Sequence, residues 1–293
     1  MNMDLNNTVN HQRASASIRG SGQDDFAKPT NGVEFALRRR LERGQKNLVP
    51  FFTAGFPNST MFLALLRAAQ DMGCDAIEVG IPFSDPIADG PAIQFSNDRV
   101  LGQGMNVSAA LKLVACAKLD IPVLLMGYLN PIRAYGIPAF VEDAGAVGIA
   151  GVIIPDLPLV SSRNPVLGMD FRMLQDSWET VYMAAPTTTP QRLAALGRAT
   201  RGFLYAVTVT GITGARQGLP RGVEAFLRNV RKATVRPILA GFGISDPQQA
   251  RAIARHCDGV IVGSALIDQI RSGPQRGAVK RASRLLRQLR EVL

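Results

Sequence analysis

Short apolar runs alternate with amphipathic segments along most of this chain. From residue 48 onward the apolar runs are rich in β-branched side chains, as buried strands usually are. The segments between them carry apolar residues three and four positions apart, which is the spacing of one helix face. The pattern predicts strands at Leu48–Ala54, Ala76–Val79, Pro122–Tyr128, Gly151–Pro155, Val181–Ala185, Phe203–Val209, Pro237–Ala240 and Gly259–Val262. It predicts helices that include Met61–Met72, Ser108–Ala117, Ala139–Ala144, Arg192–Arg198 and Gln248–Ala254.

The alternation of strands and helices predicts a parallel sheet, because parallel strands need a crossover connection of the βαβ kind. The strand runs are almost continuously apolar, as in a sheet whose outer face is covered by helices. Eight such units in about 240 residues have the size of a (β/α)8 TIM barrel, so we predict an α/β protein with one barrel domain. A doubly wound open sheet is the alternative, since periodicity does not show whether a sheet closes.

The two ends of the chain differ from its middle. Residues 1–30 are rich in Asn, Ser, Gln and Gly, and bury too little apolar surface to offset the entropy of ordering, so we expect a disordered N-terminal extension. The barrel domain is then expected to span residues 31–293. The formal net charge is +10, and the basic excess lies in residues 38–46 and 271–293. The pattern of both segments predicts amphipathic helices whose basic face is solvated. The alternative is that these basic faces bind nucleic acid or a membrane.

Composition narrows the class of protein. A chain of 293 residues with 46% hydrophobic and 19% charged side chains is neither a disulfide miniprotein nor a fibre. The cysteines Cys74, Cys116 and Cys257 lie far apart and form no CxxC pair, which indicates a reducing compartment and no metal site. No apolar run is long enough to cross a bilayer, and no secretory signal is evident. We therefore expect a cytoplasmic protein that binds neither membrane nor nucleic acid.

The predicted second strand ends at Glu78, and a loop with Asp85 and Asp89 follows. The active site of a TIM barrel lies at the carboxyl ends of its strands, so these carboxylates are candidates for catalysis. Glu78 follows an apolar run, and desolvation there would raise its pKa and make it a proton donor near neutral pH. Asp89 lies in a polar loop and would stay ionised, so the two carboxylates could divide acid and base work. The alternative to a catalytic role is structural: Asp85 and Asp89 would cap turns, and Glu78 would pair with a neighbouring basic side chain.

A phosphate site is indicated by glycines at three successive strand ends. Strands six, seven and eight are followed by Gly211–Gly214, Gly241–Ser245 and Gly263–Ser264. Glycine loops that enter helices expose backbone N–H groups, and barrels commonly bind phosphate after their last strands. The implied ligand is a small phosphorylated molecule with an apolar part.

These residues carry a resemblance to a known family. The segment Ile77–Pro91 with Ile93 and Gln94 closely resembles the hallmark of the tryptophan synthase alpha chain family. The similarity continues, in family order, through Phe52–Gly55, Leu125–Met126, Asn130–Pro131, Pro155–Pro158, Ala185–Thr189, Gly211–Gly214, Gly241–Ser245 and Gly263–Ala265. It implies a TIM barrel that cleaves indole-3-glycerol phosphate into indole and glyceraldehyde 3-phosphate. The local alignment at Gly127 and Tyr128 is ambiguous, and Phe56 stands where other members have Asp.

The resemblance also implies roles for individual residues. Glu78 would protonate the indole ring at C3, Asp89 would face the indole N–H, and Tyr205 would lie near the glycerol phosphate. The indole pocket would be lined by Phe51, Leu125, Ile153 and Phe242. The phosphate would be bound at Gly214, Gly243, Gly263 and Ser264.

A partner is implied as well. Pro82, Asp85 and Pro158 match positions that contact the beta subunit, which carries pyridoxal phosphate and receives the indole in an α2β2 heterotetramer. This chain itself would need no metal or organic cofactor, because cleavage becomes a retro-aldol step once C3 is protonated. The alternatives are a stand-alone lyase that releases indole and a non-enzymatic regulatory subunit on the same fold.

Overall fold

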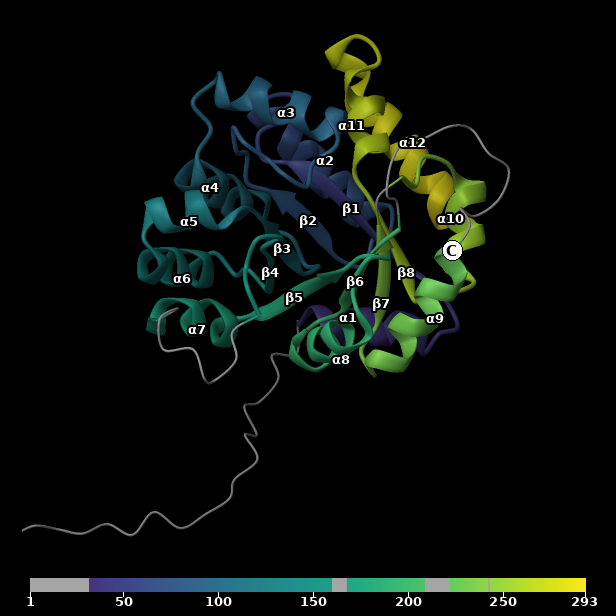
Figure 1. The fold of residues 1–293 in the computed structure, drawn as a ribbon. Helices are drawn as coiled ribbons and strands as arrows, with labels where there is room; N and C mark the ends of the chain where they lie inside the picture. Colours follow the sequence, from purple (N-terminus) through teal and green to yellow (C-terminus); the bar gives the residue numbers. More distant parts are fainter. Residues whose placement is uncertain (1–31, 160–167, 209–221, 242) are drawn as a thin grey trace, which may run out of the picture.

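The computed structural model describes residues 32–159, 168–208, 222–241 and 243–293. Its eight strands are all parallel and form a closed barrel in the order β1 to β8 (Figure 1). Closure is made by β1 and β8, where Asn47 to Pro50 pair with Gly259 to Val262. The predicted TIM barrel is therefore confirmed, and the open sheet is excluded.

The strands are short and almost wholly buried, as expected for a sheet covered by helices. They are β1 (Asn47–Thr53), β2 (Ile77–Gly80), β3 (Val123–Met126), β4 (Gly151–Ile153), β5 (Glu179–Ala184), β6 (Leu204–Val207), β7 (Ile238–Gly241) and β8 (Gly259–Val262). The sequence pattern placed all of these strands, although it extended β3 to Tyr128 and β4 to Pro155, each two residues too far. The structure ends β3 at Met126, and Tyr128 is the N-cap of the next helix.

Helices surround the barrel (Figure 1). They are α1 (Val33–Leu41), α2 (Ser59–Asp71), α3 (Pro91–Leu101), α4 (Val107–Ala117), α5 (Leu129–Tyr135), α6 (Ile137–Ala146), α7 (Gly168–Ser177), α8 (Pro190–Ala199), α9 (Val223–Ala233), α10 (Pro247–Ala254), α11 (Ser264–Arg271) and α12 (Ala278–Arg290), with a 3-10 turn η2 (Gln275–Gly277) before α12. None of the helices in the described segments has both the length and the apolar character needed to cross a membrane.

Side chains alternate between the inside of the barrel and the layer beneath the helices, because strand residues point to opposite faces in turn. Phe51 belongs to the inner cluster and Phe52 to the outer one. On β2, Ile77 and Val79 face the helices, so Glu78 between them points into the barrel. The alternation thus places a carboxyl group inside the barrel.

The amino end of the barrel is closed by α1 and joined to the C-terminal helix. Val33 and Leu37 of α1 are fully buried in the inner cluster. Asp75, just before β2, accepts hydrogen bonds from the Leu48 N–H (2.9 Å), from Arg40 (2.5 Å) and from Arg290 of α12 (3.1 Å). Part of the basic C-terminal helix therefore stabilises the fold, while Lys280, Arg284 and Arg287 on the same helix are exposed. The boundary between residues 1–30 and the barrel stays a prediction, since residues 1–31 lie outside the described segments.

Candidate active site

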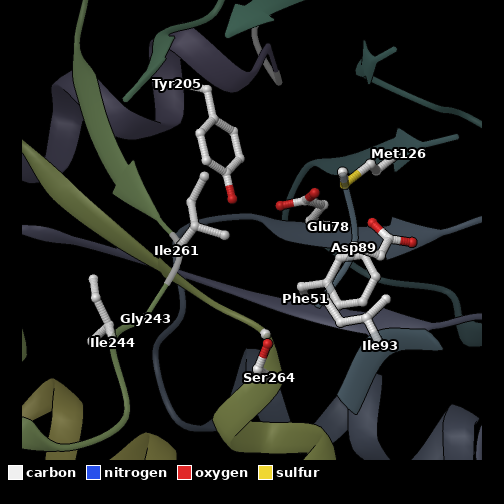
Figure 2. A pocket seen from close by; sticks show the side chains of 11 residues that line it. Phe51, Glu78, Asp89, Ile93, Met126, Tyr205, Gly243, Ile244, Ile261 and Ser264 are labelled. Carbon is white, nitrogen blue, oxygen red and sulfur yellow. The ribbon is translucent and has the colours of Figure 1, made fainter. Parts of the chain in front are cut away.

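A cavity opens at the carboxyl ends of the strands (Figure 2). Strands and following loops from both halves of the barrel contribute to it. It is lined by Phe51, Glu78, Asp89, Ile93, Met126, Tyr205, Gly243, Ile244, Ile261, Gly263 and Ser264. The carboxyl groups of Glu78 and Asp89 lie near each other in this cavity, with Gly243 on the opposite side of the view and Ser264 below them (Figure 2).

Glu78 is the most deeply buried of the cavity's ionisable carboxyl groups. Its residue is 1% exposed, and neither side-chain oxygen has a hydrogen-bond partner among the described residues. Burial, reinforced by the nearby negative charge of Asp89, raises the pKa of Glu78 from 4.5 to about 8. Glu78 therefore holds its proton at neutral pH and can donate it to a ligand in the cavity.

Asp89 has a different environment. Its Oδ2 accepts a hydrogen bond from Asn97 Nδ2 (3.1 Å), and its Oδ1 accepts one from the Tyr128 hydroxyl (3.2 Å). Partial burial raises the pKa of Asp89, and these two donors oppose the rise by stabilising the charged form. The Gln94 side chain also donates to the Asp89 carbonyl oxygen (2.7 Å), which fixes the backbone where α3 begins.

Tyr205 comes from β6, on the other side of the barrel, and its hydroxyl is directed toward Glu78 (Figure 2). Burial and the charges of Glu78 and Asp89 raise the pKa of Tyr205, so its hydroxyl stays protonated. A Cβ at position 241 would collide with the Tyr205 ring and hydroxyl, so β7 must carry glycine there.

An apolar wall completes the cavity. Phe51, Met126 and Ile261 belong to the inner cluster, and Ile93 packs against it. The Phe51 ring fits because its neighbours are glycines: a Cβ at Gly263 would lie 3.2 Å from the Phe51 Cβ, and one at Gly80 would overlap the ring. This wall suits a flat aromatic group more than a polar one.

The predicted phosphate residues that can be described lie in the loop after β7 and at the start of α11. Gly243 follows β7 with φ of +83°, Gly263 is the N-cap of α11, and Ser264 is its first residue. All three line the cavity, so the start of α11 and its free N–H groups open onto it. Gly214 lies outside the described residues, as does Phe242 of the predicted indole pocket.

The structure places two predicted pocket residues, Leu125 and Ile153, away from the cavity lining. Leu125 is buried in the outer cluster beneath the helices, and Met126 lines the cavity instead. The reason is the register of β3, in which Leu125 pairs with Val79 and Met126 with Gly80. Val79 faces outward, so its neighbour Leu125 does too. Ile153 lies inside the barrel next to Met126 but is not among the residues that line the cavity.

Two side chains that donate to Asp89 were not predicted from the sequence. Tyr128 and Asn97 hold the two oxygens of Asp89, yet neither was singled out from the sequence. A signal was present for Asn97, which is a polar residue on the buried face of α3. Tyr128 lies at the carboxyl end of a barrel strand, which is where functional residues are expected, but the ambiguous alignment there hid it.

The predicted partner residues lie at the same end of the barrel as the cavity. Asp85 is exposed in the loop after β2, and Pro158 is half-buried after β4, whereas Pro82 is buried in the free chain. Ile87, in the same loop as Asp85, is 82% exposed. Within the described segments, no group of three or more His, Cys, Asp or Glu side chains is arranged to hold a metal ion.

The sequence and the fold were compared with known proteins. The family model described as tryptophan synthase alpha chain matches residues 37–292. The tryptophan synthase alpha chain of Pelobacter propionicus is 43% identical over 263 residues, which cover 88% of this chain and 97% of that protein.

Two solved structures show the same similarity. Tryptophan synthase subunit alpha from Legionella pneumophila superposes with a TM-score of 0.78 at 30% identity, covering 89% of this chain and 98% of its own. A chain of the tryptophan synthase α2β2 complex from Pyrococcus furiosus has a TM-score of 0.75 at 33% identity, covering 83% of this chain and 97% of its own.

Proposed function

The chain is a member of the tryptophan synthase alpha chain family, and we propose that Glu78 and Asp89 carry the family's reaction in it. Members of the family are carbon–carbon lyases that cleave indole-3-glycerol phosphate into indole and glyceraldehyde 3-phosphate. The observation that supports the residue assignment best is the buried Glu78 carboxyl group, which lacks a hydrogen-bond partner among the described residues and lines the cavity beside Asp89.

Glu78 begins the reaction as an acid. Its protonated carboxyl group transfers a proton to C3 of the indole ring, which turns the ring into an electron-accepting indolenine cation. The substrate hydroxyl then loses its proton, the bond between C3 and the glycerol carbon breaks, and the bonding electrons return to the indole ring. Glu78, now ionised, is the base that takes the hydroxyl proton, so the same group serves both steps. Because this is a retro-aldol cleavage, the chain needs no cofactor of its own.

Asp89 stabilises the cation. Two donors hold it in the ionised form, and its negative charge faces the indole N–H, where positive charge develops. Phe51, Met126 and Ile261 form the apolar surface on which the indole ring lies.

The other end of the substrate lies across the cavity. The phosphate is bound at Gly243, Gly263 and Ser264, where N–H groups at the start of α11 are free to donate. Tyr205 lines the same cavity and contacts the glycerol phosphate.

The chain works with a beta subunit in an α2β2 assembly. The related P. furiosus structure is of such a complex, in which the subunits activate each other. Asp85, Pro82 and Pro158 contact the beta subunit, which holds pyridoxal phosphate and receives the indole. We place the assembly in the cytoplasm, in keeping with the three cysteines, all of which are free thiols.

The test is the release of indole from indole-3-glycerol phosphate by the purified chain, with and without a beta subunit. Slow release that rises sharply when the beta subunit is added is the expected result. Fast release that the beta subunit does not change would instead identify a stand-alone lyase. If no indole appears under either condition, the proposed reaction is wrong for this chain.

A further inference from the structure

We propose that Tyr128 is the positioning residue of Asp89: its hydroxyl fixes the Asp89 carboxylate in the orientation that the lyase reaction needs. This inference rests on the proposed function, because it takes Asp89 as the group that stabilises the cation. Tyr128 was not among the residues expected in the site, and it is not one of the residues that line the cavity.

The geometry gives the Tyr128 hydroxyl a fixed direction. The hydroxyl oxygen accepts a hydrogen bond from the Ala88 N–H (2.9 Å), and the hydroxyl lies 3.2 Å from Asp89 Oδ1. A tyrosine hydroxyl has a single proton, and the Ala88 contact uses an oxygen lone pair. The proton is therefore left for Asp89, and the hydrogen bond runs from the hydroxyl to the carboxylate.

The ring that carries this hydroxyl is itself held in place. Tyr128 is 4% exposed, and its ring packs against that of Phe83 with 5.4 Å between centroids. On the backbone side, the Leu129 N–H donates to Asp156 Oδ1 (2.9 Å), so the start of α5 is tied to the loop after β4. A donor supported in this way needs no reorganisation when charge develops nearby, which is the condition for electrostatic catalysis.

Tyr128 and Asn97 act on different oxygens of Asp89. Asn97 reaches Oδ2 from α3, the helix that follows Asp89, whereas Tyr128 reaches Oδ1 from the segment between β3 and α5, a separate part of the chain. Two donors from two directions stop the carboxylate from rotating about its last bond. Phe83 and Ala88 belong to the loop that also carries Asp85. Tyr128 therefore contacts both this loop and the Asp89 carboxylate.

The charge state of Asp89 depends on the same contact. Burial and the hydrogen bonds from Tyr128 and Asn97 act on the pKa of Asp89 in opposite directions. The other titratable groups that act on these two residues are Glu78 on β2, Tyr205 on β6, and Asp156, which accepts from the Leu129 N–H. Loss of the Tyr128 donor would leave burial less opposed, so the pKa of Asp89 would rise.

The variant Tyr128→Phe tests the proposal, because it removes the hydroxyl and keeps the ring that packs on Phe83. Tyr135→Phe is a matched control: Tyr135 also donates to an aspartate, Asp143, but both lie outside the cavity. Both variants and the unaltered chain are assayed for indole release with the beta subunit across pH. Melting temperatures are measured alongside to detect any change in stability.

The expected result for Tyr128→Phe is a fall in kcat of roughly ten-fold, the size of one lost hydrogen bond to a charged group, with a smaller change in KM. Its activity should also rise at a higher pH than that of the unaltered chain, since activity on the acid side follows ionisation of Asp89. Tyr135→Phe should match the unaltered chain in both respects.

The proposal would be overturned if Tyr128→Phe had the same kcat as Tyr135→Phe and if its activity rose with pH over the same acidic range. A loss of activity explained by a lower melting temperature with an unchanged pH profile would overturn it too, because that would show a purely structural role. Failure of the unaltered chain to release indole is a separate result, which would reject the proposed function instead.

Discussion

One buried carboxyl group, that of Asp75, lies just before β2 and another, that of Glu78, lies within it, and their surroundings are opposite. Asp75 lies before the strand, where the Leu48 N–H, Arg40 and Arg290 all donate to it. Glu78 lies inside the strand, and its oxygens receive no hydrogen bond from the described residues. Removing one member of a buried, fully paired set of charges is strongly destabilising, whereas a buried carboxyl group without partners is costly to ionise. Asp75 thus contributes to stability at the amino end of the barrel, and Glu78 provides a reactive group for the cavity at the carboxyl end, which is the division of roles common in TIM barrels.

The largest expected effect is at the reactive end. Glu78→Gln keeps the size of the side chain but cannot move a proton, so indole release should fall by about a thousand-fold or more. Folding should persist, because the neutral amide replaces a group that is already protonated at neutral pH. Indole release and circular dichroism measure the two effects. Residual activity within ten-fold of the unaltered chain would remove Glu78 from its assigned role.

The opposite behaviour is expected at the amino end. Asp75→Ala leaves Arg40 and Arg290 without their shared partner, so the free energy of unfolding should fall by roughly 3 kcal/mol. Indole release per folded molecule should not change, since Asp75 takes no part in the cavity. Urea denaturation measures the stability, and the assay is run well below the midpoint. A loss of activity in fully folded Asp75→Ala would contradict the assignment of a purely stabilising role to Asp75.

The pH dependence of stability sharpens the comparison. Folded Glu78 keeps its proton to about pH 8, whereas an unfolded chain releases it near 4.5, so the folded state binds more protons between these values. The free energy of unfolding should therefore fall as pH rises through this range. Glu78→Gln removes this term, so it should gain stability over the unaltered chain as pH increases from 5 to 9. Parallel pH curves for the two proteins would contradict the raised pKa of Glu78.

The smallest effects are expected on the exposed face of α12. Arg284 and Arg287 are exposed, so changing both to Ser should alter stability by no more than about 0.5 kcal/mol and leave activity intact. Arg290→Ser, on the same helix, removes a partner of Asp75 and should cost clearly more. Thermal melts of the two variants and the unaltered chain compare them directly, and equal losses in the two variants would show that the half-buried Arg290 contributes no more to stability than the exposed arginines.

The sequence predicted the positions of the strands well, but it predicted less well which strand residues point into the barrel. Each of the eight strands was found because apolar runs bounded by glycine and proline are a strong local signal. The choice of Leu125 over Met126 failed for a physical reason: in a strand buried on both faces, every position is apolar, so no polar residue marks the inward side. Glu78 escaped this ambiguity because it is the single charged residue in β2.

Local sequence was sufficient to determine the alternation of strands and helices, the family and the loop that carries Asp85 and Asp89, because these depend on residues close together in the chain. Tertiary structure alone decided which buried carboxyl group has partners. Arg290 reaches Asp75 across 215 positions, and Tyr128 reaches Asp89 across 39. Such contacts exist only once the barrel has closed, when β8 pairs with β1 and the ends of distant strands are brought together.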